Sequence, residues 1–209
     1  MDAPVRPLRA DAARNRTRVL VAARIAFAEA GLDVGVEEIA RRAGVGKGTL
    51  YRRFPTKEVL VRAIFEDILD EVEQLVDEVE TIPDAGEAFA HYLGSAARMQ
   101  ASNQGFFDVV AQRLGSAALT DEQRQRIVAA AGRPLGRAQA AGVVRADLVP
   151  EDVILMLRMV GATTRQAPDG SPMDDHWPRY LGLLLDALRP EVATALPAEP
   201  WRLAPKPAP

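Results

Sequence analysis

The residues between positions 35 and 54, GVEEIARRAGVGKGTLYRRF, constrain the fold more than any other part of the chain. In their first half, apolar residues recur at the i, i+3, i+4 and i+7 spacing of one helix face, at Val36, Ile39, Ala40 and Ala43. Gly44 follows directly, and glycine readily adopts the left-handed conformation that ends a helix. Leu50 and Phe54, at i and i+4, predict the inward face of a second short helix. Two short helices joined by a glycine turn are typical of a helix-turn-helix, whose second helix enters the DNA major groove.

The second predicted helix presents polar and basic residues on the side opposite Leu50 and Phe54. Its N-terminal end points into the groove in this motif, so Lys47 can donate to guanine acceptors, and Tyr51 can contact a base or a phosphate. The other cations suit phosphates, which position a protein without reading sequence. A solvated basic face beside a packing core is the alternative interpretation. The predicted DNA contacts are Lys47, Gly48, Thr49, Tyr51, Arg52, Arg53 and Lys57.

A longer ordered set of residues around this motif resembles the TetR family of bacterial transcriptional regulators. The set consists of Arg18-Val19-Leu20, Ala22-Ala23, Phe27, Gly31, Val36-Glu37-Glu38-Ile39-Ala40, Ala43-Gly44-Val45, Lys47-Gly48-Thr49-Leu50-Tyr51, Phe54 and Lys57-Glu58. It covers residues 14 to 66, and beyond them only the helical character and the length agree. The resemblance implies an all-α homodimer. Each subunit would carry an N-terminal DNA-binding domain and a larger helical domain for dimerisation and ligand binding.

The chain departs from the family pattern at two helix starts. Members of the family usually have Thr or Ser just before Val36 and just before Lys47, whereas this chain has Gly35 and Gly46. Glycine caps a helix N-terminus only a few tenths of a kcal/mol less well than Ser or Thr. The fold is therefore expected to persist, while a hydroxyl contact to a phosphate is lost at both places. Arg53 stands where the family often has His and keeps the positive charge.

The charge of the chain is divided unevenly along its length. The net charge is −3, but residues 1–60 carry 12 Lys and Arg against 7 Asp and Glu, whereas residues 61–209 carry 14 against 22. A basic N-terminal part and an acidic remainder fit one domain that faces DNA and one that faces away from it. No segment approaches the ~18 consecutive apolar residues of a membrane span. Because the start also lacks a signal peptide, we expect a cytoplasmic protein without membrane contact.

Helical periodicity continues through the rest of the chain, and no stretch alternates as a strand would. We predict an all-α fold of about nine helices: an N-terminal three-helix DNA-binding domain, then a larger helical dimerisation and ligand-binding domain. The predicted divisions are a flexible basic arm at 1–13, the helix-turn-helix domain at 14–56, the helical domain at 57–189 and a Pro-rich tail at 190–209. The arm could follow phosphates or enter a minor groove, and a disordered tail without a role is the alternative.

Several helix limits can be predicted from capping residues. Thr56 and Asp84 precede long apolar-periodic segments, and Thr120 with Gln123 has the spacing of a capping box. Between the second and third of these caps we predict two helices, over about 85–102 and 104–114. The helix that begins after Thr56 joins the two predicted domains, so it could carry a signal between them.

The last two predicted helices carry more apolar surface than one subunit can cover. Two such helices from each subunit would form a four-helix interface about a two-fold axis. Intrasubunit core is the alternative for these residues. The predicted interface residues are Val153, Leu157, Val160, Gly161, Thr164, Tyr180, Leu181, Leu184 and Leu188. A dimer also suits the DNA motif, because two recognition helices roughly 34–36 Å apart read a near-palindromic site.

Aromatic and Met residues at helical spacing are candidates for an apolar ligand pocket in the larger domain. Ordinary core is the alternative for each of them. The candidate ligand-binding residues are Tyr92, Met99, Phe106, Phe107, Val110, Met156, Met159 and Trp177. Asp174, Asp175 and His176 could hold a metal ion, but we interpret them as a solvated loop and helix N-terminus, so we predict neither a metal site nor a cofactor.

The leading functional hypothesis is a homodimeric transcriptional repressor that a small-molecule ligand releases from a near-palindromic operator. A second hypothesis keeps DNA binding but uses the C-terminal domain only for dimerisation or a protein partner, with activation as possible as repression. A third is an enzyme with a helical pocket. The chain has no Cys, only two His, no phosphate-binding loop and no metal-ligand spacing, so no catalytic residue is predicted.

Overall fold

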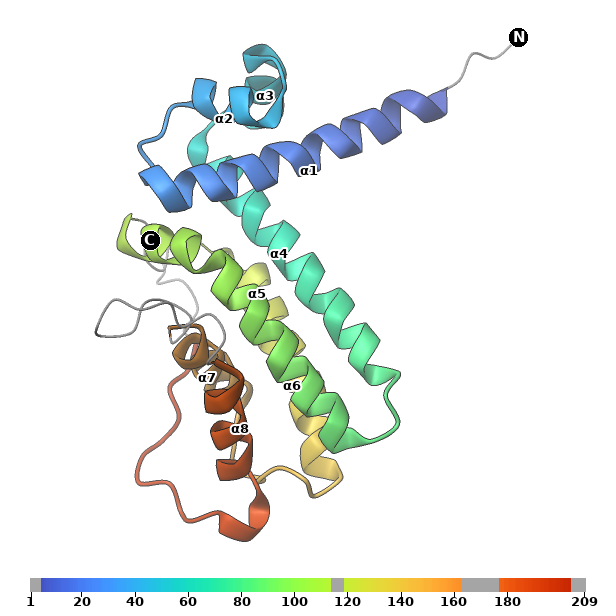
Figure 1. Cartoon of the computed structure of the whole chain (residues 1–209), viewed down its shortest axis with the longest axis vertical. Coiled ribbons are helices and arrows are strands. Elements are labelled where there is room, and N and C mark those ends of the chain that lie inside the picture. Colours follow the sequence, from blue (N-terminus) through green and yellow to red (C-terminus); the bar gives the residue numbers. More distant parts are fainter. Residues whose placement is uncertain (1–4, 114–118, 163–176, 204–209) are drawn as a thin grey trace. The chain divides into compact units, whose positions relative to one another are not determined.

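The computed structural model describes residues 5–113, 119–162 and 177–203, and these residues form eight α-helices and no strand (Figure 1). The helices are α1 (Val5–Ala30), α2 (Val36–Ala43), α3 (Lys47–Arg53), α4 (Lys57–Glu80), α5 (Ala85–Arg113), α6 (Asp121–Ala140), α7 (Pro150–Ala162) and α8 (Trp177–Ala187). A 3-10 helix follows at Pro190–Val192. The predicted all-α fold is confirmed. None of the described helices is long and apolar enough to cross a membrane.

The chain divides into two compact units. The N-terminal unit comprises the residues up to Ile68 together with Gly105–Leu119, and the C-terminal unit comprises Leu69–Gln104 and the residues from Thr120 onward. Helices α4 and α5 therefore contribute to both units. The predicted division after residue 56 differs from this one, because the first three turns of α4 carry apolar side chains that the N-terminal unit buries.

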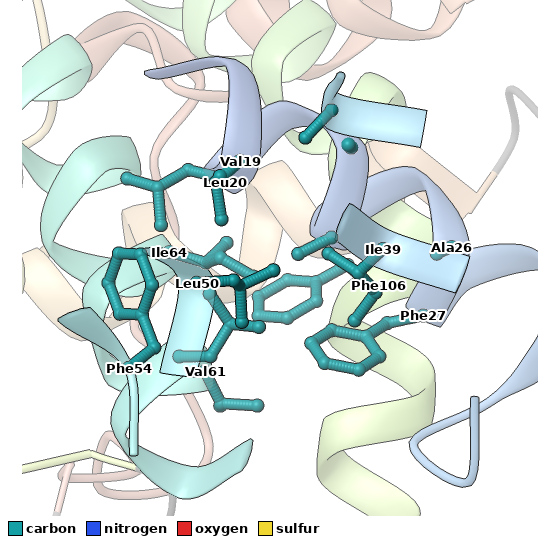
Figure 2. Close-up of a cluster of buried hydrophobic side chains, with 14 of the residues drawn as sticks. Val19, Leu20, Ala26, Phe27, Ile39, Leu50, Phe54, Val61, Ile64 and Phe106 are labelled. Carbon is teal, nitrogen blue, oxygen red and sulfur yellow. The ribbon is translucent and has the colours of Figure 1, made fainter. Parts of the chain in front are cut away.

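The core of the N-terminal unit joins five helices, α1 to α5, around buried apolar side chains (Figure 2). Leu20 and Phe27 of α1, Ile39 of α2 and Leu50 of α3 are at most 1% exposed. Phe106 of α5 lies among them, with its ring centroid 6.5 Å from that of Phe27. Burying one such side chain contributes about 1.5–3 kcal/mol, so this cluster supplies most of the force that holds the two short helices in place.

The core of the C-terminal unit lies between α5, α6, α7, α8 and the second half of α4. Its buried side chains include Val76, Phe89, Leu93, Leu135 and Val153. These residues recur at helical spacing on each helix, as the periodicity predicted. One apolar stripe on each helix therefore points into a shared core.

Two arginines of α6 tie this helix to the acidic face of α4. Arg126 donates to Asp70 and Glu73. Two turns further along α6, Arg133 donates to Asp77 and Glu80. Both the arginines and their partners are spaced by seven residues, so the same contact repeats every two turns. The hydrogen bond from Arg126 holds the pKa of Glu73 below its usual value. Part of the acidic face of α4 therefore faces α6.

The predicted helix caps are present. Thr120 and Gln123 form a reciprocal capping box at the start of α6. The Asp84 carboxylate accepts from the backbone N–H of Glu87 at 2.7 Å, and the Thr56 hydroxyl accepts from that of Val59 at 3.3 Å. Local side chain to backbone bonding fixed these starts, which is why the sequence could predict them.

Two predicted helix limits were wrong, and part of the predicted tail makes side-chain contacts. Residues 5–13 belong to α1 and not to a non-helical arm; Pro7 lies in the first turn, where the missing N–H costs the helix nothing. The break predicted near residue 103 is absent, because α5 continues to Arg113. Part of the Pro-rich tail is held in place: Arg145 donates to the carbonyl of Thr194 at 2.5 Å, and Arg202 pairs with the buried Glu151 at 3.3 Å.

A glycine in α5 allows a close approach to α1 within the N-terminal unit. A Cβ atom on Gly105 would lie 2.8 Å from the Cβ of Ala28 and 3.4 Å from its Cα. Neither atom can move without shifting the α1 backbone. The absence of a side chain at Gly105 therefore sets the distance at which Phe106, its neighbour in the sequence, reaches the core.

We expect Gly105→Ala to destabilise the protein by about 1–3 kcal/mol, because overpacking outweighs the gain in helix propensity. Urea unfolding followed by circular dichroism measures the change. Gly136→Ala in α6 is the matched control, since a Cβ there meets nothing within 4 Å, and it should be neutral or stabilising. Equal stability of the two variants would show that α1 and α5 can separate at little cost.

Candidate nucleic-acid interface

Helices α2 and α3 are joined by a turn that glycine makes possible. Gly44 ends α2 in the left-handed conformation, with φ at 64°, and its N–H donates to the carbonyls of Ala40 and Arg41. Gly46 is extended and precedes the first residue of α3. Neither Gly35 nor Gly46 offers a side-chain cap, as the sequence required. The two helices with this turn are the helix-turn-helix that the sequence predicted.

Arg18 of α1 supports this turn, a role that sequence reasoning missed. Its guanidinium donates to the Gly44 carbonyl at 3.2 Å and to the Asn15 side chain at 3.0 Å. The turn carbonyl is one of the groups that the end of α2 leaves without an intrahelical partner. Arg18 therefore positions the turn and is not itself on the outward face of α3. A basic residue at the start of the matching motif was the available signal, but spacing alone could not show its partner.

The outward face of α3 is open to solvent. Leu50 is 1% exposed and Phe54 is buried beside it, so the rest of the helix turns outward. Six of the seven predicted contact residues are exposed, namely Lys47, Gly48, Thr49, Tyr51, Arg52 and Arg53. Their arrangement suits a helix that enters a groove, with polar groups at the N-terminal end and cations at the C-terminal end. Their contacts with DNA stay a prediction.

Lys57 differs from the other predicted contacts. It is half-buried at the start of α4, and its ammonium group donates to the Leu32 carbonyl at 2.8 Å. That bond ties α4 to the segment between α1 and α2. Lys57 is therefore occupied in holding two elements together, and a phosphate contact would have to share its remaining donors.

Lys47 forms an ion pair with an acid of α2. Its ammonium group donates to the carboxylate of Glu37, in the first turn of α2, and stands 5.8 Å from the centre of the Tyr51 ring. The pair raises the pKa of Lys47 and lowers the pKa of Glu37, chiefly through this hydrogen bond. Both groups are therefore charged at neutral pH.

Two further arginines of α2 are balanced by acids. Arg41 and Arg42 both donate to Glu38, at distances of 2.7 to 2.8 Å, and Arg42 also pairs with Glu29 of α1 at 2.6 Å. Hydrogen bonds from the two arginines lower the pKa of Glu38 to about 2. These cations were absent from the predicted contact set. Glu38 and Glu29 therefore neutralise part of the positive charge of α2.

Comparison with known proteins gives one family for both parts of the chain. Residues 19–64 match the family of bacterial regulatory proteins named tetR, and residues 84–190 match the C-terminal domain of SbtR-like transcriptional regulators. A TetR transcription regulatory protein from Mycobacterium vanbaalenii is 36% identical, with 88% of this chain and 99% of that chain covered and a TM-score of 0.64. The chain belongs to the TetR family. It is a DNA-binding transcriptional regulator with the helix-turn-helix in its N-terminal unit.

Other solved structures of transcriptional regulators share this fold. The TetR transcriptional regulator SCO0520 from Streptomyces coelicolor is 32% identical, with 84% of this chain and 98% of that chain covered and a TM-score of 0.65. FadR from Bacillus subtilis, solved in complex with stearoyl-CoA, is 19% identical and shares the fold, with 83% and 99% covered and a TM-score of 0.60. No curated protein matches the sequence.

The candidate ligand residues of this TetR-family protein do not form one group. Phe106, Phe107 and Val110 pack in the core of the N-terminal unit, whereas Tyr92, Met99, Met156 and Trp177 pack in or against that of the C-terminal unit. Met159 is 65% exposed. Because α5 is continuous, Tyr92 and Phe106 are about 21 Å apart along it, at 1.5 Å per residue. The predicted set is therefore divided between two apolar cores, and its role in ligand binding stays a prediction.

The predicted dimer residues that the structure describes differ in exposure, and most of them are buried or half-buried within the chain. Val153, Val160, Gly161, Leu181 and Leu188 are buried within one chain, and Leu157 and Leu184 are half-buried against the same core. A Cβ on Gly161 would lie 2.8 Å from the Gln100 side chain of α5, so this glycine serves intrachain packing. Thr164 lies outside the described residues. Tyr180 is the one residue of the described set that is exposed, at 39%.

Proposed function

We propose that this TetR-family regulator is a cytoplasmic homodimeric repressor that binds a near-palindromic operator and is released from it by a small-molecule ligand. The observation that carries the DNA part is the exposed face of α3 opposite the buried Leu50, in a chain whose family binds DNA. This face combines hydrogen-bonding groups at its groove end with two arginines at the other end. Nothing in this role requires catalysis by the protein.

The decisive test is selection of bound duplexes from a random pool with the purified full chain at a stated salt concentration. A dimer with two recognition helices predicts two inverted half-sites about one helical turn apart. Recovery of such a near-palindrome supports the proposal. A single half-site would contradict the dimeric part, and a pool without any motif would contradict sequence-specific binding.

Single substitutions on α3 should separate base reading from phosphate binding. Lys47→Ala or Tyr51→Ala should cost about 1–3 kcal/mol of binding to the selected site and relax its sequence preference. Arg53→Ala should weaken binding to all duplexes about equally and reduce the slope of log affinity against log salt by about one. Fluorescence anisotropy titrations on specific and random duplexes measure both. Equal losses on the two duplexes for Lys47→Ala would remove its base-reading role.

Dimerisation is proposed through exposed apolar side chains of α7 and α8. Met159 on α7 is 65% exposed, and Leu183 and Tyr180 on α8 are 56% and 39% exposed. Large apolar groups gathered on two helices of a soluble chain are typical of a surface that a partner covers. A second copy is the partner that a near-palindromic site requires, because each copy supplies one recognition helix.

Release by a ligand is proposed for the C-terminal unit. A ligand shifts DNA affinity when it binds the DNA-free state more tightly than the DNA-bound state. FadR from Bacillus subtilis, which shares the fold, was solved in complex with stearoyl-CoA, so a protein of this fold can bind a ligand with a long acyl chain. Tyr92 and Asn103 are buried polar residues on this unit's part of α5, and burial raises the pKa of the Tyr92 hydroxyl, which therefore stays neutral. Loss of operator binding on addition of a long-chain acyl-CoA, with CoA as the control, would support this step.

The alternative keeps DNA binding but assigns the C-terminal unit to dimerisation or to a protein partner. The packing of Tyr92, Met99 and Met156 against one apolar core favours it, because these residues were the candidate pocket lining. Under this alternative, operator affinity stays unchanged with acyl-CoA and with other apolar compound classes. The dimer and the selected DNA motif would be the same under both proposals.

A further inference from the structure

The ion pair between α2 and α3 lies on the exposed side of the helix-turn-helix. Glu37 and Lys47 have side chains that are 60% and 55% exposed, and the ammonium group donates to Oε1 of the carboxylate. The centre of the Tyr51 ring lies 5.8 Å from the same ammonium group. The Lys47 ammonium group therefore contacts an acid and lies near an aromatic ring before any DNA is present.

The Glu37 carboxylate lies close to Gly35, the residue that precedes α2. A Cβ on Gly35 would lie 3.3 Å from Oε2 of Glu37, so a larger residue there would shift the carboxylate by a few tenths of an ångström. The charge of Glu37 is favourable in the first turn of α2, because the N-terminus of a helix is the positive end of the helix dipole.

An exposed ion pair of this kind contributes little to stability, at most about 1 kcal/mol. Near DNA, an acid costs affinity because it repels phosphates. An acid that holds a base-reading lysine is therefore a disadvantage for DNA binding unless its oxygens find donors in the groove. The major groove offers such donors on only some bases: the exocyclic amino groups of cytosine and adenine.

We propose that Glu37 is a specificity-determining residue that, together with Lys47, reads one G·C base pair in each half-site. In the major groove, guanine presents its O6 and N7 acceptors beside the N4 amino donor of the paired cytosine. A lysine adjacent to a glutamate presents the complementary pattern: the Lys47 ammonium donates to guanine, and the free lone pairs of Glu37 accept from cytosine. This assignment rests on the proposed operator binding.

The same geometry explains how the pair would reject an A·T base pair. Adenine places its N6 amino donor where guanine has the O6 acceptor, and thymine places its O4 acceptor where cytosine has the amino donor. Lys47 would then face a donor, and the Glu37 carboxylate would face an acceptor. Both members of the pair contribute to the discrimination, so removing either should relax the same base pair.

The test compares the duplexes that full-length wild type and Glu37→Ala select from one random pool. Wild type should enrich a G·C pair at one position of each half-site, and the variant should lose about tenfold of that preference over A·T while the other positions are unchanged. Binding of the variant to random duplexes should be equal or stronger, because a negative charge has been removed. The double variant Glu37→Ala, Lys47→Ala should lose base preference at the same position as Lys47→Ala alone, and at no other position.

Glu58→Ala is the matched control. Glu58 is also an exposed acid in the first turn of a helix of the N-terminal unit, and its pKa is lowered by backbone bonding and by Thr56. It should leave every base preference unchanged. Retention of the G·C preference in Glu37→Ala, or a uniform change in affinity at all sequences, would overturn the role of Glu37 while leaving the proposed function intact. A wild-type pool without a motif would overturn both.

Discussion

Leu183→Glu is expected to convert the protein from a dimer to a monomer and to lower operator affinity about a hundredfold. Leu183 is 56% exposed on α8, so the charge should not disturb the fold of a single chain. At a two-fold interface, however, each copy would bury a carboxylate against an apolar surface, and an unpaired buried charge is strongly unfavourable. The affinity falls because two linked DNA-binding domains bind an operator more tightly than one domain does, by a factor of about 10² or more.

Light scattering coupled to size exclusion and titration of the selected operator measure the two effects. Leu196→Glu is the matched control, because Leu196 is also exposed, at 49%, but lies beyond α8 in the C-terminal segment. It should remain dimeric with unchanged affinity. A dimeric Leu183→Glu protein with full operator affinity would exclude this face of α8 from the interface.

Leu50→Ala is expected to lower the free energy of unfolding by about 2–5 kcal/mol. Leu50 is 1% exposed and is the buried anchor of α3, a helix of seven residues that cannot be stable alone. Its removal leaves a cavity beside Phe54 and Ile39, and α3 loses the contact that orients its outward face. Operator affinity should therefore fall along with stability, although Leu50 itself faces away from DNA.

Urea unfolding monitored by circular dichroism measures this change. Val59→Ala is the control, since Val59 is an exposed apolar residue near the start of α4, and it should change the stability by less than about 0.5 kcal/mol. A loss as small as that of Val59→Ala would mean that α3 is held chiefly by its other contacts.

Much of the DNA-binding end could be predicted from the sequence because its determinants are local. The apolar spacing of Ile39 and Ala40, the left-handed Gly44 and the inward Leu50 all act within a few residues of one another. The helix caps at Asp84 and Thr120 were predictable for the same reason. Wherever one side chain decides a turn or a helix start through its own neighbours, the order of residues is enough.

The sequence was less informative where a side chain meets a distant partner. Nothing in the spacing indicated that Arg18 would hold the Gly44 carbonyl or that Lys57 would hold that of Leu32. Nor did the spacing indicate that Glu37 would pair with Lys47, which lies ten residues further along the chain. These pairings depend on the angle between helices, which no short pattern contains.

The sequence by itself determined the helical class, the helix-turn-helix, the asymmetry of charge and the family. The tertiary structure alone decided which apolar side chains of α7 and α8 are core and which are surface: Val153 and Leu181 are buried, while Met159 and Leu183 are exposed. On helices as rich in apolar residues as α7 and α8, apolar residues recur at helical spacing on more than one face, so the periodicity does not select the buried one. Only the packing of neighbouring helices selects the face that is covered within the chain and the face that is left for a partner.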